Sequence, residues 1–223
     1  MIDLRLVLHP KPELGRVDTS LRYTDILFGF VIRELFLRLQ NWSQLTDSVR
    51  WHLVVGTTLV LGSWIGYRRS QNRTTYEVKF FNLPLFRFLV DQLMLILYFR
   101  IAVLTEVDGH GLPTDSDLAA STINLVMYVF VLYVVWDLFG IWMARSMTKG
   151  STPRYPQVVD GKMSEGAQPA DWVGFFISTS VLAVFAVLWC RANVFDPQGL
   201  FVLVVLLLLT YRMAKEIRTS WRS

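Results

Sequence analysis

Residues 118–143 read LAASTINLVMYVFVLYVVWDLFGIWM, a run in which Asp137 carries the only charge. A transmembrane helix needs about 20 consecutive, mainly apolar residues, so this run is long enough to cross a bilayer. Two more runs follow in the C-terminal half: 172–189 (WVGFFISTSVLAVFAVLW) and 198–213 (QGLFVLVVLLLLTYRM). That half of the chain therefore predicts three membrane-spanning helices.

The N-terminal half contains three more runs, and they carry more charge. They are 23–39 (YTDILFGFVIRELFLRL), 51–67 (WHLVVGTTLVLGSWIGY) and 80–104 (FFNLPLFRFLVDQLMLILYFRIAVL). Of the 223 residues, 53% are hydrophobic and 18% charged, and the mean hydropathy is +0.39. A soluble globule of this size cannot bury so many apolar residues, which excludes most soluble enzyme classes and disordered or fibrous proteins. We expect an all-α fold, a polytopic membrane bundle of about six transmembrane helices.

The basic residues predict the orientation of this bundle. If all six runs cross with the N-terminus inside, the inner segments hold sixteen Lys and Arg and the outer segments hold two. Cytoplasmic segments near span ends are enriched in these residues, so we expect both termini in the cytoplasm, in the cell inner membrane. The first twenty residues lack the apolar run of a secretory signal, so insertion should depend on the internal runs. The net charge of +4 fits this orientation rather than nucleic-acid binding.

The stretch 144–171 is rich in Gly, Pro and Ser and predicts a flexible cytoplasmic linker. It divides an N-terminal four-helix membrane part, 1–143, from a C-terminal hairpin with a basic tail, 172–223. Arg68, Arg69 and Arg73 follow the second run. They are candidates for contact with lipid headgroups or with a soluble cytoplasmic partner.

Ionisable side chains at membrane depth are the main functional candidates, because they are costly in lipid. The first run holds Asp25, Arg33, Glu34 and Arg38. Glu34 and Arg38 are four residues apart and can pair, which leaves Arg33 without an in-helix partner of that spacing. Asp91 or Asp137 on other helices could neutralise Arg33. An ion pathway through Asp25, Arg33 and Glu34 is one interpretation; a buried structural pair, or a helix lying partly in the interface, is the other.

Charges in the third and fourth runs predict structural roles. Arg87 and Asp91 are four residues apart and can pair within one helix, and Arg100 can extend to the outer interface. Asp137 could be the counter-ion of Arg33 or of the basic residues 68–73, or it could lie at the level of the headgroups. Gly56, Gly62 and Gly66 in the second run permit close helix packing.

Catalytic and metal-binding patterns are missing from the sequence. It contains no GxxxxGK[ST], GxSxG or strand-linked GxGxxG motif, and Cys190 is its single cysteine. His9, His52 and His110 are scattered without the spacing of a metal site. We therefore expect no enzymatic activity, no metal and no cofactor.

The first run also carries a short motif. Tyr23-Thr24-Asp25, followed by ILFGFVI, resembles the Phe-Ser-Asp core of the prokaryotic six-helix potassium-permeable channels, whose Arg-x-x-x-Phe-Ser-Asp first helix lines the pore of a tetramer. The order of the runs is similar as well. The resemblance implies a homo-oligomeric channel with the first helix around the pore. Thr19 stands at the place of the motif arginine, and Arg33-Glu34 interrupts the apolar constriction of that family; a ring of arginines facing the pore would favour anions.

Three functions remain as hypotheses. The leading one is an oligomeric membrane channel for inorganic ions with the first helix lining the pore. The second is a non-conducting membrane anchor or sensor subunit that recruits a soluble cytoplasmic protein or binds the lipid bilayer through its basic segments. The third is a proton-coupled secondary transporter in which Asp25, Glu34 and Asp91 carry protons.

Overall fold

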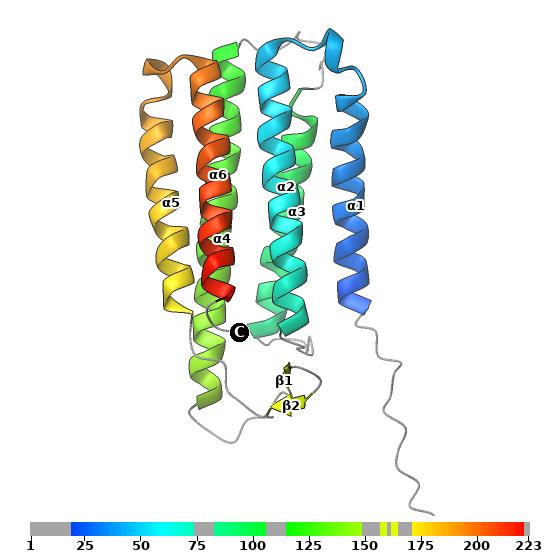
Figure 1. The fold of residues 1–223 in the computed structure, drawn as a ribbon, viewed down its shortest axis with the longest axis vertical. Helices are drawn as coiled ribbons and strands as arrows, with labels where there is room; N and C mark the ends of the chain where they lie inside the picture. Colours follow the sequence, from blue (N-terminus) through cyan, green and yellow to red (C-terminus); the bar gives the residue numbers. More distant parts are fainter. Residues whose placement is uncertain are drawn as a thin grey trace, which may run out of the picture.

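The protein is an up-and-down bundle of six long helices (Figure 1). The computed structural model describes residues 19–73, 83–105, 115–148, 157–159, 162–164 and 171–220. The helices are α1 (Thr19–Leu39), α2 (Asp47–Arg73), α3 (Leu83–Val103), α4 (Asp115–Thr148), α5 (Trp172–Cys190) and α6 (Pro197–Ser220). Each of the six apolar runs coincides with one helix, so the all-α prediction is confirmed.

Two helices in the described part of the chain, Asp115–Trp142 and Trp172–Cys190, are long and apolar enough to cross a membrane. They contain the predicted runs 118–143, apart from its last residue, and 172–189. Their composition supports insertion into a membrane.

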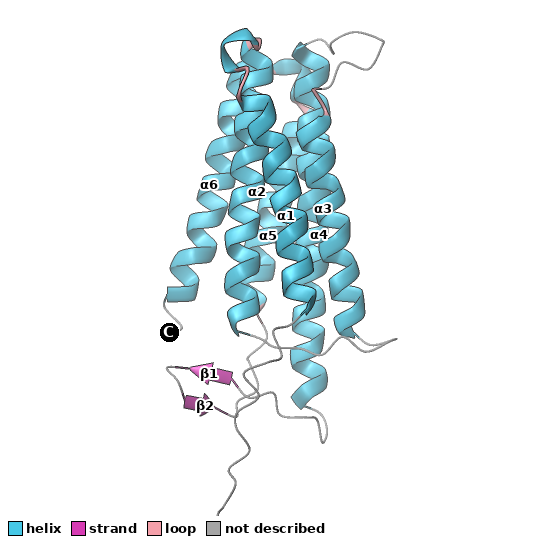
Figure 2. Cartoon of the chain, turned by 90° about the vertical axis from the view of Figure 1, so that its right-hand side faces the viewer, coloured by secondary structure: helices cyan, strands magenta, loops and turns pink. Residues whose placement is uncertain are grey.

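The predicted linker contains more regular structure than its composition indicated. Helix α4 continues to Thr148, five residues past the boundary at 143. Strands β1 (Gln157–Val159) and β2 (Lys162–Ser164) form an antiparallel hairpin in which Val158 pairs with Met163 (Figure 2). The helices on either side of the linker belong to one bundle, because α5 and α6 pack against α4 and α2.

The α1–α2 and α5–α6 connections have the same design. In each, a three-residue 3-10 helix, η1 (Trp42–Gln44) or η2 (Ala192–Val194), is followed by two residues and then by the next helix. The residue before that helix caps it: Thr46 Oγ1 accepts from the backbone N–H of Val49 at 3.4 Å, and Asp196 Oδ2 accepts from that of Gly199 at 3.1 Å. These connections lie at the same end of the bundle, which we call the upper end as drawn in Figure 1; the C-terminus lies toward the lower end.

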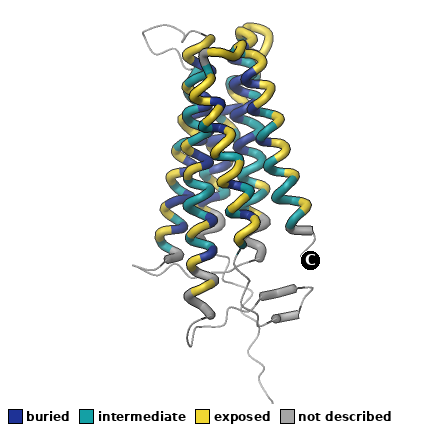
Figure 3. The backbone as a smooth tube through the Cα atoms, turned by 90° about the vertical axis from the view of Figure 1, so that its left-hand side faces the viewer, coloured by how far each residue is buried: buried dark blue, intermediate teal, exposed yellow. Residues whose placement is uncertain are grey.

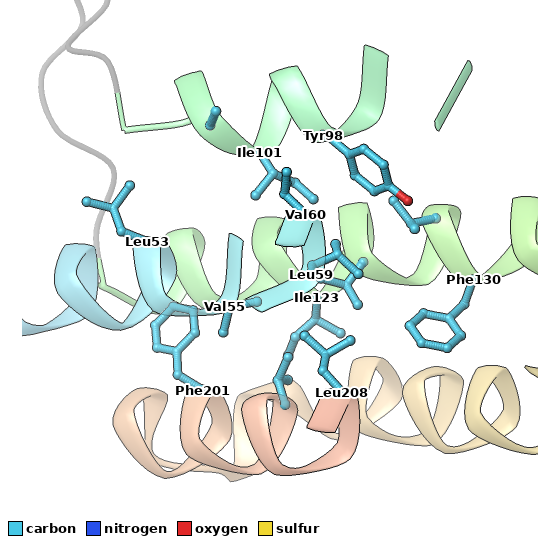
Figure 4. Packing of buried hydrophobic residues seen from close by; sticks show 14 of the residues in the cluster. Leu53, Val55, Leu59, Val60, Tyr98, Ile101, Ile123, Phe130, Phe201 and Leu208 are labelled. Atoms are coloured by element: carbon cyan, nitrogen blue, oxygen red, sulfur yellow. The ribbon is translucent and has the colours of Figure 1, made fainter. Parts of the chain in front are cut away.

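Helices α2 and α4 hold the bundle together. Helix α2 packs against α1, α3, α4 and α6, and α4 packs against α2, α3, α5 and α6. Buried aliphatic side chains fill the space between them, including Leu59, Ile101, Ile123 and Leu208 (Figure 4). Gly56 lets α1 and α3 approach α2, since a Cβ there would lie 3.0 Å from Ile101 and 3.4 Å from Leu35.

The outer surface of the bundle is unusually apolar for a protein surface. All six helices expose large hydrophobic side chains, and their outward faces alternate with buried positions along the whole bundle (Figure 3). Examples from four helices are Phe30 (59% exposed), Ile96 (58%), Phe176 (61%) and Leu206 (59%). Exposed apolar patches of this extent mark contact with lipid or with other proteins.

Candidate functional site

Asp25, the first candidate of the ion pathway, is held between α1 and α2. Its Oδ1 accepts a hydrogen bond from Trp64 Nε1 at 3.1 Å, and its Oδ2 lies 3.3 Å from Arg68 Nη1. The Arg68 guanidinium also lies 5.9 Å from the centroid of the Trp64 ring, near the limit of about 6 Å for a cation–π contact. The Asp25 charge is therefore balanced within its own chain, by one of the basic residues predicted to contact lipid.

The other residues of the Tyr23-Thr24-Asp25 motif, and the other basic residues that follow the second run, have different surroundings. Tyr23 is exposed and Thr24 is fully buried. Arg69 and Arg73 lie in the last turns of α2, and their side chains fall outside the described part of the structure.

Glu34 pairs with Arg38, as the spacing predicted. Glu34 Oε1 lies 3.0 Å from Arg38 Nη2, and Arg38 Nη1 donates to Thr105 Oγ1, just beyond α3, at 3.5 Å. The pair is partly buried on the side of α1 that faces α3. The negative charge of Glu34 is thus also balanced within the chain.

Arg33 has a different environment. It is exposed, and it forms no ion pair or hydrogen bond with any other residue of the described ranges. The surrounding face of α1 is apolar and exposed, with Ile26, Phe30, Phe36 and Leu37 on it. Gly29, one turn earlier on the same face, leaves open space, because a Cβ there would meet nothing within 4 Å.

The three pathway candidates therefore do not meet within one chain. Asp25 faces α2, Glu34 faces α3, and Arg33 points away from the bundle. Neither Asp91 nor Asp137 reaches Arg33 in this structure. Their surroundings are given next.

Arg87 and Asp91 are both buried, and their charges interact. The Arg87 guanidinium stacks on the Trp136 ring of α4, with 3.7 Å between its central carbon and the ring centroid. Stacking on an aromatic ring suits a desolvated arginine. These contacts fasten α3 to α4, in line with a structural role.

Asp137 is the centre of a buried polar cluster, and its partner differs from those predicted. Lys215 Nζ of α6 donates to Asp137 Oδ2 at 2.9 Å and to Oδ1 at 3.2 Å. Ser178 Oγ of α5 donates to Asp137 Oδ2 at 2.6 Å and lies 3.3 Å from Tyr211 Oη. Within the described side chains, the cation at the Asp137 carboxylate is thus Lys215, and neither Arg33 nor Arg68 pairs with it.

Lys215 lies two residues beyond the apolar run 198–213. Burial lowers the pKa of its ammonium group, but the neighbouring Tyr211 and Asp137 raise it more, so the pKa lies above its ordinary value. Lys215 is therefore charged at neutral pH and balances the carboxylate of Asp137.

A chain of hydroxyl groups extends this cluster across the bundle. The Tyr211 ring stacks on Tyr133 with 5.8 Å between centroids, and Tyr133 Oη lies 2.9 Å from Tyr98 Oη of α3. Ser63 of α2 hydrogen-bonds to Tyr133 as well. The ring stack thus joins two hydrogen-bonded groups, one of side chains from α4, α5 and α6 and the other of side chains from α2, α3 and α4.

Five residues of these hydrogen-bonded groups were not among the candidates predicted from the sequence: Lys215, Tyr211, Tyr133, Tyr98 and Ser63. A signal was present: Tyr133 and Asp137 on α4, and Tyr211 and Lys215 on α6, are each separated by four residues. Residues four apart share a helix face, so each helix presents a tyrosine next to a charge, and the two charges are opposite.

His52 is the third buried polar centre. It is fully buried in α2, with Nδ1 2.7 Å from Thr122 Oγ1 and Nε2 2.8 Å from the carbonyl oxygen of Ile101. Both ring nitrogens are therefore used in fastening α2 to α3 and α4. Within the described residues, no group of three or more His, Cys, Asp or Glu could hold a metal ion. His9 and His110 lie outside the described residues.

Comparison with known proteins found no matching family model, no matching curated protein and no matching solved structure.

Proposed function

We propose that the chain crosses a membrane six times, assembles with copies of itself, and conducts ions along α1. The observation that carries the proposal is Arg33, an exposed arginine in the last third of α1 with no partner among the described residues.

The dimensions and surface of the bundle support six crossings. Trp172 and Trp189, near the two ends of α5, are separated by about 26 Å along the helix axis at 1.5 Å per residue. That separation is close to the hydrocarbon thickness of about 30 Å, and tryptophans favour its two boundaries. The remaining helices run roughly parallel to α5 and also expose apolar side chains, as a lipid-embedded bundle requires. The sixteen basic residues of the inner segments against two in the outer ones support an orientation with the lower end in the cytoplasm, in the cell inner membrane.

Arg33 would be expensive in such a bundle if α1 faced only lipid. A charged residue at the centre of a membrane helix costs about 3 kcal/mol by insertion measurements. Asp25 and Glu34 do not offset this cost, because each is already paired with another arginine of the chain. Several copies packed around an axis, with the exposed face of α1 inward, would place Arg33 in water instead. A water-filled axis between identical helices is an ion pore.

A proton-coupled transporter is the second candidate, since Asp91 and Asp137 are buried carboxylates that contact cations. Intramembrane carboxylates of this kind serve as proton relays in transporters. The two candidates differ in what drives flux, so one assay separates them.

The test is ion flux in proteoliposomes that contain the purified protein, under gradients of KCl or NaCl and, separately, of protons. We expect electrogenic flux that follows the salt gradient and changes several-fold in Arg33→Ala. Arg100→Ala is the matched control, because Arg100 is an exposed arginine on α3, near its upper end. Absence of flux from correctly folded wild-type protein would contradict the channel, and flux that depends on a proton gradient would favour the transporter instead.

A further inference from the structure

We infer that the permeant ion of the proposed channel is a small inorganic anion such as chloride. The inference rests on the proposed function, because it concerns the same helix. It departs from the potassium permeability implied by the resemblance of the Tyr23-Thr24-Asp25 motif. The charge that an ion meets along α1 is set by which charged side chains of the helix have partners within the chain.

The exposed face of α1 centres on Arg33. At 100° per residue, Tyr23, Ile26, Gly29, Phe30, Phe36 and Leu37 all lie within about 80° of Arg33 around the helix. All six positions are exposed. These six positions present apolar side chains, one tyrosine and one glycine; the side chains of Thr19 and Arg22, on the same face nearer the start of the helix, fall outside the described part of the structure.

The two carboxylates of the helix do not contribute a free negative charge to this face. Asp25 lies at its edge but is bound by Arg68 and Trp64 of α2. Glu34 lies about 100° away and is bound by Arg38, which also contacts Thr105. Among the charged side chains that the structure describes on α1, those of Asp25, Glu34, Arg38 and Arg33, the last has no counter-ion, and it is positive.

Gly29 gives the Arg33 side chain room to meet an ion. Side chains on a helix lean toward its N-terminus, so a side chain at 33 extends over position 29. A Cβ at Gly29 would meet nothing within 4 Å. The guanidinium therefore has open space beside it, and no neighbouring side chain of the described residues occupies its donors.

A ring of such arginines selects ions by charge. In an assembly with the exposed faces of α1 inward, each copy contributes one Arg33 at the same depth, and like charges repel across the axis. An anion relieves this repulsion and accepts hydrogen bonds from the guanidinium, whereas a cation is excluded. Arginine and lysine rings select anions in other pores for the same reason. The apolar rings at Ile26 and Phe30 offer cations no compensating ligand.

The experiment is the chloride-to-potassium permeability ratio of wild-type protein in planar bilayers, from the reversal potential under asymmetric KCl. We expect chloride to be favoured at least about tenfold, which corresponds to about 1.4 kcal/mol. Arg33→Gln should reduce the ratio by a similar factor, Arg33→Glu should invert it, and Arg33→Lys should preserve it. Arg100→Gln should leave it unchanged, and each variant is first checked for the elution profile of the wild-type oligomer.

The outcomes separate the two proposals. Conductance that favours potassium, with a ratio that does not respond to the charge at position 33, would overturn the anion inference and leave the channel intact. A wild-type oligomer that conducts neither ion would overturn the channel itself and this inference with it. Inversion by Arg33→Glu together with preservation by Arg33→Lys would support both.

Discussion

Asp137 shows how a single residue fastens three helices. Its carboxylate accepts hydrogen bonds from Ser178 of α5 and from Lys215 of α6, while it belongs to α4. Only 5% of the Asp137 side chain is exposed, against 20% for Lys215, so neither charge is fully solvated. A buried pair of this kind is costly to break on one side, because the remaining charge loses its partner in a medium that solvates it poorly.

We predict that Lys215→Met destabilises the protein more than Lys215→Met combined with Asp137→Asn. The single variant leaves a buried carboxylate without its cation, at a cost of about 3–5 kcal/mol, whereas the double variant removes both charges. The measurement is thermal unfolding of detergent-solubilised protein. Arg50→Met is the control, because Arg50 pairs with Asp47 at 2.9 Å on the exposed upper end and should contribute less than about 1 kcal/mol. Equal stability of the single and double variants would show that Asp137 does not need a counter-ion.

The charges of the site were predictable from the sequence, but their partners were only partly so. Glu34 and Arg38 pair as expected, because a spacing of four fixes neighbours on one helix. Asp25 and Arg68, or Asp137 and Lys215, come from different helices, and their pairing depends on how those helices pack. Hydrophobic periodicity gives the buried face of a helix but does not say which helix lies against it.

At the scale of elements, the bundle contains two hairpins of similar construction. Arg68 lies 21 residues after Asp47, the first residue of α2, and Arg218 lies 21 residues after Pro197, the first residue of α6. Each arginine pairs with an aspartate near the start of the preceding helix, Asp25 for Arg68 and Asp171 for Arg218. Asp171 also caps α5 by accepting from the backbone N–H of Gly174 at 2.8 Å. The lower end of each hairpin is thus closed by an ion pair.

No internal repeat was visible in the sequence, and the structure explains why. The two connections share a backbone path and a capping oxygen, which Thr46 or Asp196 supplies equally well. The helices of the two hairpins have different neighbours, because α2 packs against α1, α3, α4 and α6, whereas α6 packs against α2, α4 and α5. Their side chains are therefore chosen for different neighbours, and residue identity is lost while the backbone geometry remains. The six helices themselves were predictable because apolar runs of that length leave few alternatives.

We predict that Gly56→Leu destabilises the junction of α1, α2 and α3. A side chain at this position would collide with Ile101 and Leu35, and both of these are buried. Overpacking of this kind costs about 1–3 kcal/mol, partly offset by the better helix propensity of leucine. Gly140→Leu in α4 is the matched control, because a Cβ there meets nothing within 4 Å. Thermal unfolding measures both, and a Gly56→Leu protein as stable as Gly140→Leu would contradict the close packing described here.

For the whole molecule, the outer surface is apolar, and a mainly apolar core encloses several polar groups that have partners. Phe30, Ile96 and Leu206 face outward, whereas Asp137, His52 and Asp91 lie inside with partners from other helices. Such a surface suits the proposed membrane location, because in lipid apolar side chains cost nothing at the surface and polar groups must find partners within the protein. The composition therefore predicted a membrane bundle, but it could not predict that Arg33 faces outward. The amphipathic pattern of α1 does not say which of its faces lies against the other helices.

The orientation of the bundle can be tested with its own single cysteine. Cys190 is the last residue of α5 and is exposed, and the α5–α6 connection that follows it lies at the upper end. If the lower end is cytoplasmic, as the basic residues predict, a membrane-impermeant maleimide added to intact cells should label Cys190. The matched variant, Cys190→Ser with Ser164→Cys, moves the thiol to strand β2 in the predicted cytoplasmic linker. It should react only after the membrane is permeabilised. The opposite pattern would reverse the orientation. Labelling of both positions from outside would mean that residues 164 and 190 lie on the same side of the membrane, which would contradict α5 as a membrane span.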